Sequence, residues 1–333
     1  MNQAPWQIPT LVDVLRARRQ IEPYLYRTPL HRYPALAAEV GTPTWVKHEN
    51  HQPIGAFKVR GGVNLVSQLG DAERAAGVIA ASTGNHGQSV AYAARLFGVR
   101  AIIVVPEGAN QAKVASMRAL DAEVIVHGRD FDDARGHAER LAEERGHRYV
   151  HSGNEPLLIS GVGTATLEIL EDEPSIDTLI VPIGGGSGAA GAIVAGKAIK
   201  PDLEIIGVQA EAAPAAYLSW KSRALQEATM STFAEGLQTR TAFALPQQIL
   251  WDGLDDFVLV GEDEIRRAML LLLARTRNLI EGAGAASLAA ALKLRDRLAG
   301  RNVALICSGG NVTVEQLTAL LQTAQALTPS GAV

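Results

Sequence analysis

Short apolar runs alternate with amphipathic stretches from about residue 77 onward. The runs are rich in Val and Ile and are bounded by Gly, Pro or polar residues, a pattern typical of strands buried in a parallel sheet. Helical spacing of apolar residues marks 88–97 and 157–170, and Gly98 suits the left-handed turn that ends a helix. The predicted buried parallel strands are residues 77–81, 101–105, 123–126, 178–183, 204–208 and 303–307.

This alternation predicts a doubly wound α/β fold with right-handed crossovers. A chain of 333 residues suggests two domains, or one large α/β domain with a smaller one attached. We predict a small open-sheet domain, 71–150, inserted into a large domain formed by 1–70 and 151–333. Thr10 and Asp13 resemble a capping box at the first helix. The two ends, 1–8 and 329–333, are expected to fray.

Composition and charge narrow the classes of function. The formal net charge of -4 gives no reason to expect nucleic acid or an anionic membrane as a partner. Cys307 is the only cysteine, which excludes an intrachain disulfide, and its apolar neighbours predict unreactive packing. The first twenty residues contain no apolar signal segment, and the apolar run 268–274 is far shorter than the roughly 20 residues of a membrane span. We therefore expect a soluble, cytoplasmic protein.

Four segments are unusually polar or rich in glycine. In open α/β sheets, ligands bind where loops leave the carboxyl ends of strands, so these segments are candidates for one site. They are Gly55-Ala-Phe-Lys58, Ala81-Ser-Thr-Gly-Asn-His-Gly87, Gly184-Gly-Gly-Ser-Gly188 and Cys307-Ser-Gly-Gly-Asn311.

The third segment follows a predicted strand and precedes a helical stretch, which predicts a phosphate-binding loop. Its glycines let the backbone approach a ligand, and free N–H groups with the helix dipole stabilise a dianion. A plain strand-to-helix turn is the alternative, but successive glycines are costly unless the backbone must be exposed. The members of the loop are Gly184, Gly185, Gly186, Ser187 (a further hydroxyl donor) and Gly188.

The same loop supports a rival hypothesis. Gly186-x-Gly188-x-x-Gly191 matches the dinucleotide fingerprint, and Glu211 follows at about the spacing of a ribose ligand. An NAD(P)-dependent oxidoreductase is therefore the alternative from another enzyme class. It leaves Lys58 and the segments around Asn85 and Ser308 unexplained.

Lys58 follows Phe57 and lies among glycines, which predicts confined and partly apolar surroundings. Desolvation lowers the pKa of a lysine and makes its neutral amine a nucleophile toward carbonyl groups. A single lysine after a phenylalanine is more often a surface residue. Its significance therefore depends on the other segments.

Together, the segments resemble the fold type II pyridoxal-phosphate (PLP) family, which is similar to the β subunit of tryptophan synthase, and in particular its threonine/serine dehydratases and serine racemases. The resemblance extends from about residue 28 to 317, with several motifs in the family's order and spacing. They are Lys47-His-Glu-Asn50, Gly55-Ala-Phe-Lys-Val-Arg-Gly61, Ser82-Thr-Gly-Asn-His-Gly-Gln88, the Gly184 loop, Ala234-Glu-Gly236 and Ser308-Gly-Gly-Asn311.

The resemblance implies a role for each motif. Lys58 would hold PLP as a Schiff base and remove the substrate's α-proton, and Phe57 would back the cofactor ring. Asn85 would hydrogen-bond the 3′-oxygen, and the Gly184 loop and Gly236 would lie at the cofactor. Ser308 would face the pyridine nitrogen. Substrate carboxylate binding would fall to the loop of Ser82, Thr83, Gly84, Asn85 and His86.

The implied reaction is β-elimination. A hydroxyl such as that of Ser308 leaves the pyridine nitrogen neutral, which favours elimination over transamination. We expect a threonine/serine ammonia-lyase that gives a 2-oxo acid and ammonia. Thr83 stands where racemases of this family carry a basic serine and many dehydratases carry alanine, so racemisation stays an alternative. A β-replacement synthase or a non-catalytic sensor are others.

Several further positions carry side chains that bind metals or line cofactor sites in other proteins. Gln209, Ala213 and Ala215 stand where relatives have acidic cation ligands, so no metal is expected there. Glu281 matches an acidic position near the cofactor and is either a tuner of the Ser308 hydrogen bond or a helix-terminal carboxylate. The remaining candidates, Glu211, Glu235 and the pair His48 and His51, are interpreted as ordinary polar or structural residues.

The sequence after the last motif is short. We therefore expect no effector-binding domain and no feedback inhibition by isoleucine. Relatives are commonly homodimers or larger, and the same is expected here, with a small amino acid as the substrate.

Overall fold

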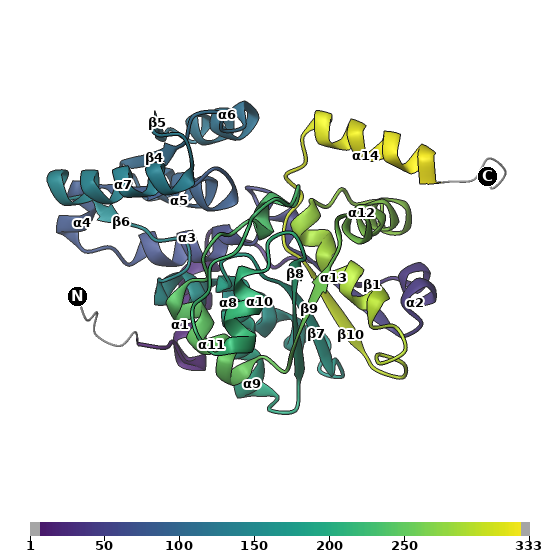
Figure 1. The fold of residues 1–333 in the computed structure, drawn as a ribbon. Coiled ribbons are helices and arrows are strands. Elements are labelled where there is room, and N and C mark those ends of the chain that lie inside the picture. Colours follow the sequence, from purple (N-terminus) through teal and green to yellow (C-terminus); the bar gives the residue numbers. More distant parts are fainter. Residues whose placement is uncertain (1–6, 328–333) are drawn as a thin grey trace.

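The computed structural model describes residues 7–327. Two sheets organise it, the smaller at the upper left of Figure 1 and the larger at the lower right. Apart from Gln7 and Ile8, the ends predicted to fray lie outside the described residues. The capping box of Thr10 and Asp13 is confirmed at α1 (Leu11–Ile21), because the Thr10 N–H donates to the Asp13 carboxylate at 2.8 Å.

The larger sheet has six strands. Neighbouring strands are parallel except for the first pair. Leu305 in the buried central strand lies opposite Val46 on one side and Ile180 on the other. The order across the sheet is β1 (Leu30–Arg32), β2 (Thr44–His48), β10 (Val303–Cys307), β7 (Thr178–Pro182), β8 (Glu204–Ala210) and β9 (Asp256–Val260).

The smaller sheet has four parallel strands. Their order is β5 (Glu123–Val126), β4 (Ala101–Val105), β3 (Val78–Ala81) and β6 (Arg148–Tyr149). The prediction that residues 123–126 are buried is wrong, because β5 is an edge strand with half-buried and exposed residues. An edge strand has a neighbour on only one side, which leaves it open to water.

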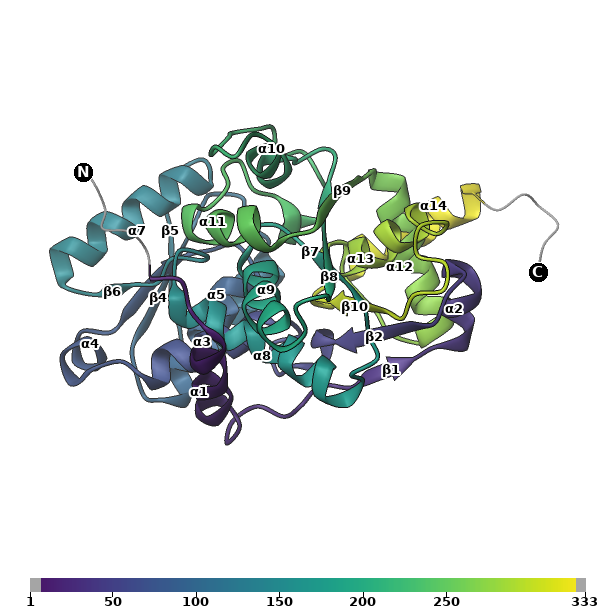
Figure 2. The ribbon, with the colours of Figure 1, turned by 90° about the horizontal axis from the view of Figure 1, so that it is seen from below.

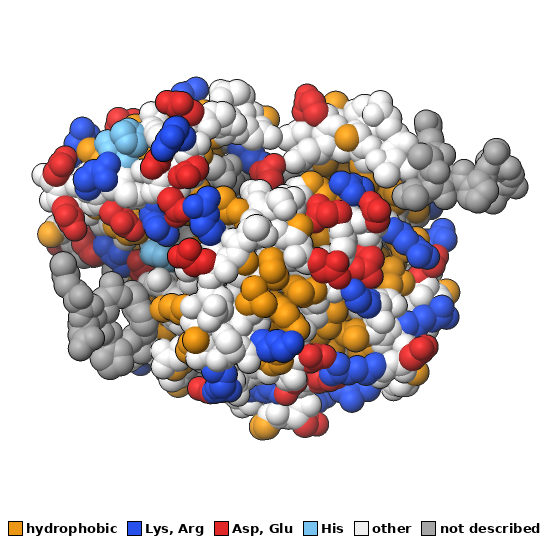
Figure 3. Space-filling model, in the orientation of Figure 1, with side chains coloured by type: hydrophobic (Ala, Val, Ile, Leu, Met, Phe, Trp, Pro, Cys, Tyr) orange, Lys and Arg blue, Asp and Glu red, His pale blue; other side chains and the backbone are white. Residues whose placement is uncertain are grey.

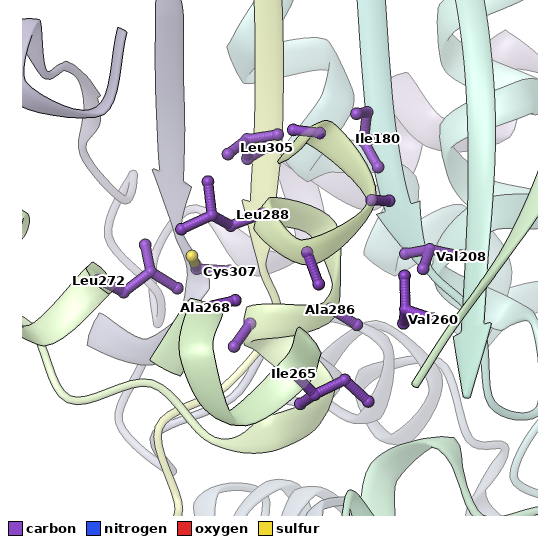
Figure 4. Packing of buried hydrophobic residues seen from close by; sticks show 14 of the residues in the cluster. Ile180, Val208, Val260, Ile265, Ala268, Leu272, Ala286, Leu288, Leu305 and Cys307 are labelled. Atoms are coloured by element: carbon purple, nitrogen blue, oxygen red, sulfur yellow. The ribbon is translucent and has the colours of Figure 1, made fainter. Parts of the chain in front are cut away.

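Helices cover both faces of the larger sheet. Successive residues of a strand point to opposite sides, so each face carries apolar side chains that helices bury. Leu179 belongs to a cluster with α8 (Pro156–Asp172), α9 (Ser187–Ile199) and α11 (Ala244–Gly253). Ile180 belongs to a second cluster with α2 (Pro34–Val40), α12 (Glu262–Thr276) and α13 (Gly282–Lys293). Figure 4 shows Cys307 within this second cluster, fully buried, which confirms its prediction as a packing residue.

Four helices accompany the smaller sheet, together with α3 (Lys58–Ser67), which precedes them in the chain. Val63 of α3 shares one apolar cluster with Val90 and Ile103, so packing is continuous across residue 70. The domain boundaries at residues 70 and 150 stay predictions. The four helices are α4 (Asp71–Ala76), α5 (Asn85–Leu96), α6 (Gln111–Ala119) and α7 (Phe131–Arg145).

The remaining elements connect or flank these layers. Figure 2 shows α1 beside α3 and α8, between the two sheets. The C-terminal helix α14 (Val314–Leu327) contacts α12 and extends from the body at the upper right of Figure 1. The others are η1 (Glu49–His51), α10 (Ala215–Ser222) and η2 (Glu235–Leu237). Among the described residues, no helix combines the length and apolarity that a membrane span requires.

A buried network of ion pairs lies between α3, β2 and α8. Arg60 donates to Glu49 at 2.7 Å and to Glu168 at 2.6 Å, and Lys47 donates to Glu168 at 2.6 Å. The two cations balance the two carboxylates, which allows all four side chains to be buried. Since Arg60 follows Lys58 by two residues, the network anchors the face of α3 opposite to Lys58.

Candidate active site

The four segments converge on one cavity of about 400 Å³. They lie at the carboxyl ends of β3, β7 and β10 and at the start of α3. The predicted convergence is therefore confirmed. Every predicted site residue lines the cavity: Phe57, Lys58, Ser82, Thr83, Gly84, Asn85, His86, Gly184, Gly185, Gly186, Ser187, Gly188, Gly236, Glu281 and Ser308.

Lys58 is the first residue of α3 and is directed into the cavity wall. Its Nζ donates to Ser187 Oγ at 2.9 Å and to the Ser152 carbonyl at 3.2 Å. Burial lowers the pKa of Lys58 to about 8. Both partners are neutral, so nothing holds the proton on Lys58, and about a tenth of the lysine is already the free amine at pH 7. The free amine is the form that attacks a carbonyl carbon.

The glycine loop after β7 has no room for side chains. A Cβ on Gly184 would lie 2.1 Å from the carbonyl oxygen of Gly236, and one on Gly185 would lie 2.3 Å from the ring of Phe243. Cβ atoms do not approach other heavy atoms so closely, so larger residues would displace the loop. The backbone itself forms this part of the cavity.

The loop leads into the N-terminus of α9. Gly186 has φ +89°, a left-handed conformation that favours glycine, and it caps α9 directly before Ser187. The first N–H groups of a helix lack intrahelical partners and attract anions. Gly188 follows in the first turn, where a Cβ would lie 3.1 Å from the Phe57 ring. The arrangement is suited to a phosphate group with a flat aromatic ring beside it.

Ser82 shapes the loop between β3 and α5. Its Oγ accepts hydrogen bonds from the N–H groups of Gly84 at 3.2 Å and Gly87 at 2.9 Å. The ring of His86 contacts the Val150 carbonyl at 3.0 Å, and its pKa falls to about 3 because of burial and the nearby Lys58. The imidazole is therefore neutral, and the anion-binding groups of this loop are the N–H groups that begin α5.

Asn85 is held from two sides. Its Nδ2 donates to Glu281 Oε1 at 2.8 Å, and its Oδ1 accepts from Asn311 Nδ2 at 2.7 Å. Burial raises the pKa of Glu281. Glu281 caps α13, which confirms its interpretation as a helix-terminal carboxylate, and its tuning of a Ser308 hydrogen bond stays a prediction. Ser308 lines the cavity, and its carbonyl accepts from the Phe57 N–H at 3.0 Å.

Comparison with known proteins decides which cofactor the cavity takes. A family model described as "Pyridoxal-phosphate dependent enzyme" matches residues 21–309. The chain belongs to this family. Because the family is defined by PLP and not by a dinucleotide, the oxidoreductase hypothesis is set aside.

The relatives of this PLP enzyme are similar over most of their length. The L-threonine ammonia-lyase of Thermotoga maritima is 39% identical over 94% of this chain and 78% of its own. The catabolic L-threonine dehydratase of Escherichia coli is 36% identical over 94% of this chain and 96% of its own. Among solved structures, the serine racemase of Dictyostelium discoideum matches with a TM-score of 0.87 and 32% identity, covering 92% of this chain and 100% of its own. The fold is thus the fold type II architecture, as predicted.

PLP fits the residues that are present. The glycine loop and the N-terminus of α9 offer a dianion a space that any Cβ on Gly184 or Gly185 would close. Lys58 supplies an amine of lowered pKa, and the ring of Phe57 offers a flat apolar wall. Ser308 and Asn85 place neutral hydrogen-bonding groups in the same cavity.

The sequence did not reveal the charged residues that also line the cavity of this PLP enzyme. Lys113 on α6 forms an ion pair with Glu235 on η2, which sequence patterns indicated to be an ordinary polar residue. The Asp132 carboxylate on α7 forms ion pairs with two guanidinium groups, Oδ1 with Arg135 at 3.2 Å and Oδ2 with Arg240 at 3.3 Å. These side chains lie on helices of the smaller sheet and on the segment after η2. Only the fold brings them together, and a charged residue on an amphipathic helix gives no local signal.

The candidate metal positions have other partners. Gln209 Oε1 accepts from the Tyr217 N–H at 3.0 Å. The rings of His48 and His51 stack with centroids 5.0 Å apart, and their nitrogens contact Tyr33, Asn50 and Asn278. Within residues 7–327, no group of three or more His, Cys, Asp or Glu side chains is arranged to hold a metal ion.

Proposed function

We propose that this chain is a PLP-dependent ammonia-lyase that removes water from a small β-hydroxy L-amino acid such as threonine or serine. The observation that carries this proposal is Lys58, an amine of lowered pKa that faces the phosphate-binding loop through Ser187. The names of the L-threonine ammonia-lyase and dehydratase relatives support the substrate class.

The residues divide the work of this reaction. PLP, when bound, supplies an electron sink that acidifies the α-hydrogen of an attached amino acid. Lys58 Nζ accepts that proton, and the N–H groups at the start of α5 hold the substrate carboxylate. The hydroxyl group then leaves the β-carbon and takes up a proton, so that the α-hydrogen and the hydroxyl group are lost together as one molecule of water. Hydrolysis of the unsaturated amine consumes one molecule of water and gives a 2-oxo acid and ammonia.

The other side chains position the reactants. Asn85 would donate to the 3′-oxygen of the cofactor, and Ser308 would face the pyridine nitrogen without protonating it. Since a neutral pyridine is a weaker electron sink, it favours early departure of the hydroxyl over transamination. Phe57 would cover one side of the cofactor ring. The phosphate would be held by the loop of Gly184, Gly185, Gly186, Ser187 and Gly188, with Gly236 supporting the loop.

A product assay with the purified holoenzyme tests the proposal. Threonine and serine should yield 2-oxo acid and ammonia in equal amounts, and Lys58→Ala should lower kcat by at least about a thousandfold because it removes the proton acceptor. Borohydride should attach the cofactor covalently to wild-type Lys58, as a peptide mass shows. Lys221→Ala, an exposed lysine on α10, is the matched control. A holoenzyme that forms no 2-oxo acid from any member of a β-hydroxy amino acid panel would contradict the proposal.

Racemisation is the second candidate, because Thr83 places a hydroxyl group in the cavity wall. A basic group there could add or remove a proton on the face opposite Lys58. Chiral chromatography of the unreacted amino acid in the same assay separates the two. The proposed function predicts that 2-oxo acid forms faster than the D-enantiomer.

We also propose that the protein acts in the cytoplasm as a homodimer or larger homo-oligomer with no resident metal. The support for the oligomer is the family itself, whose members are commonly homodimers or larger. Light scattering of the purified holoenzyme measures its mass directly. A mass of one chain, at the concentration of the assay, would refute the oligomer.

A further inference from the structure

A chain of three hydrogen bonds runs behind the cavity wall. Asn311 Nδ2 donates to the Ile54 carbonyl at 2.9 Å and also to Asn85 Oδ1 at 2.7 Å. Asn85 Nδ2 in turn donates to Glu281 Oε1 at 2.8 Å. The chain links the segment before α3, the loop after β10, the start of α5 and the residue that caps α13.

The direction of this chain follows from the chemistry of its ends. The backbone carbonyl of Ile54 can only accept, so Asn311 must turn its NH2 group toward it. The second hydrogen of that NH2 group meets Asn85, which must therefore present its oxygen. The nitrogen of Asn85 then faces Glu281, whose carboxylate only accepts when ionised. Both ends thus impose the same orientation, which the shape of an amide does not reveal by itself.

One N–H group of Asn85 is left over by this arrangement. Asn85 lines the cofactor cavity, whereas Asn311 lines a neighbouring cavity of about 320 Å³. The Asn85 oxygen is occupied by Asn311, so the group that Asn85 offers to the cavity is a donor.

Close packing keeps the chain in place. Gly55, at φ +68°, lies against Asn311, where a Cβ would meet Asn311 Oδ1 at 2.7 Å. Gly309 lies against Glu281 in the same way, with a Cβ 2.5 Å from Oε1. The packing leaves Asn311 and Glu281 little room to move, while their hydrogen-bond partners fix which way the amides face.

We propose that Asn311 and Glu281 are positioning residues that fix the amide of Asn85 with its nitrogen toward the cofactor. The cofactor oxygen that meets Asn85 must then accept a hydrogen bond, and its deprotonated form is favoured because an anionic oxygen is the stronger acceptor. Asn311 acts only through Asn85. The inference rests on the proposed use of PLP, and it adds that Asn311, which lines the neighbouring cavity and not the cofactor cavity, contributes to the preference for a deprotonated ring oxygen.

A double-mutant cycle on cofactor affinity tests this proposal. The dissociation constant of PLP is measured by absorbance titration for Asn311→Ala, Asn85→Ala and the double variant, with thermal unfolding as a check on folding. Asn311→Ala should weaken binding about fivefold to tenfold, the effect of one lost hydrogen bond. In the Asn85→Ala background the same change should have almost no effect. Asn302→Ala, a surface asparagine bonded to Ser175, is the control and should leave affinity unchanged.

Glu281 has its own pair of variants. Glu281→Gln can turn its carbonyl oxygen to Asn85 and should retain wild-type affinity for PLP. Glu281→Ala should weaken PLP binding when Asn85 is present and should have almost no effect when it is combined with Asn85→Ala. The absorbance titration with pH should show that Asn311→Ala also moves the ionisation of the bound cofactor toward higher pH, because its anionic oxygen loses an oriented donor.

The outcomes separate this inference from the proposed function. Unchanged PLP affinity in Asn311→Ala, or an equal loss with and without Asn85, would overturn the positioning role even if the enzyme releases ammonia. A holoenzyme that shows the predicted coupling but eliminates no water would instead contradict only the proposed reaction.

Discussion

Lys58 owes its lowered pKa to burial rather than to neighbouring charge, and its hydrogen-bond partners are a hydroxyl group and a carbonyl. A desolvated amine loses its proton more easily, because only the charged form suffers from the removal of water. An acidic partner would do the opposite and hold the proton on the amine. The residue is thereby prepared as a nucleophile before the cofactor arrives.

The rate of cofactor capture should therefore titrate with this amine. With a pKa of about 8, the neutral fraction of Lys58 rises from about a tenth at pH 7 to about nine-tenths at pH 9. The rate constant for capture of PLP by the apoprotein should rise over this range and then level off. Stopped-flow absorbance follows it, with a small lysine derivative of ordinary pKa as the control. If both rates still rise in parallel between pH 9 and 10, the lowered pKa is refuted.

At the scale of elements, the turn from β7 into α9 makes the phosphate-binding loop out of backbone. Gly184→Ala would bring its Cβ within 2.1 Å of the Gly236 carbonyl, so either the loop or η2 must move. We expect PLP affinity to fall at least about tenfold, since misplaced N–H groups lose much of their charge-assisted bonding. Equilibrium dialysis measures it. Gly70→Ala, where a Cβ meets no atom within 4 Å, should bind PLP as the wild type does.

The start of α3 depends on the buried ion-pair network behind it. Arg60→Met would leave the carboxylates of Glu49 and Glu168 buried with only Lys47 to balance them. Breaking such a pair costs about 3–5 kcal/mol of the free energy of unfolding. Urea unfolding of the apoprotein at neutral pH measures this loss. Arg16→Met, whose side chain is 73% exposed, should change stability by less than about 0.5 kcal/mol. If Arg60→Met also lost less than about 0.5 kcal/mol, the prediction would be contradicted.

The sequence predicted elements best where pattern and chemistry coincide. Val- and Ile-rich runs identified the buried strands, and glycine or hydroxyl residues at their ends identified the cavity wall. It missed β1, β6 and β9, which are edge strands, and the internal strand β2, whose run Thr44-Trp-Val-Lys-His48 is too polar to read as a buried strand. Helix α5 begins at Asn85, three residues before its predicted start, because its first turn carries polar residues and glycine. The partners of Asn85 and Lys113 were out of reach, since they come from distant elements.

At the scale of the whole molecule, ion pairs join the two sheets across the cavity. The segment that follows β8 provides both large-sheet partners, Glu235 for Lys113 and Arg240 for Asp132. Glu235 also accepts from Gln316 of α14 at 3.0 Å, so it joins three parts of the fold. Figure 3 shows acidic and basic side chains interspersed over the face that it draws, with no surface of a single charge.

These pairs should make substrate binding depend on salt. Lys113→Met should raise KM about twofold to fivefold at low ionic strength, the scale of a partly exposed ion pair, and the difference should shrink in high salt. Initial rates at several NaCl concentrations measure it. Arg223→Met removes an exposed pair with Asp252 and should leave KM unchanged. A KM ratio that is independent of salt would show that Lys113 does not act through its charge.

The burial of Cys307 has a practical consequence. The only thiol of the chain is inaccessible in β10, and burial raises its pKa, so the reactive thiolate is scarce. The folded protein should therefore behave toward maleimide dyes as if it had no cysteine. A pair of cysteines introduced on the surfaces of α7 and α12 would then be the sole attachment points. Energy transfer between two dyes could follow the distance between the two sheets during turnover, without first removing a native residue.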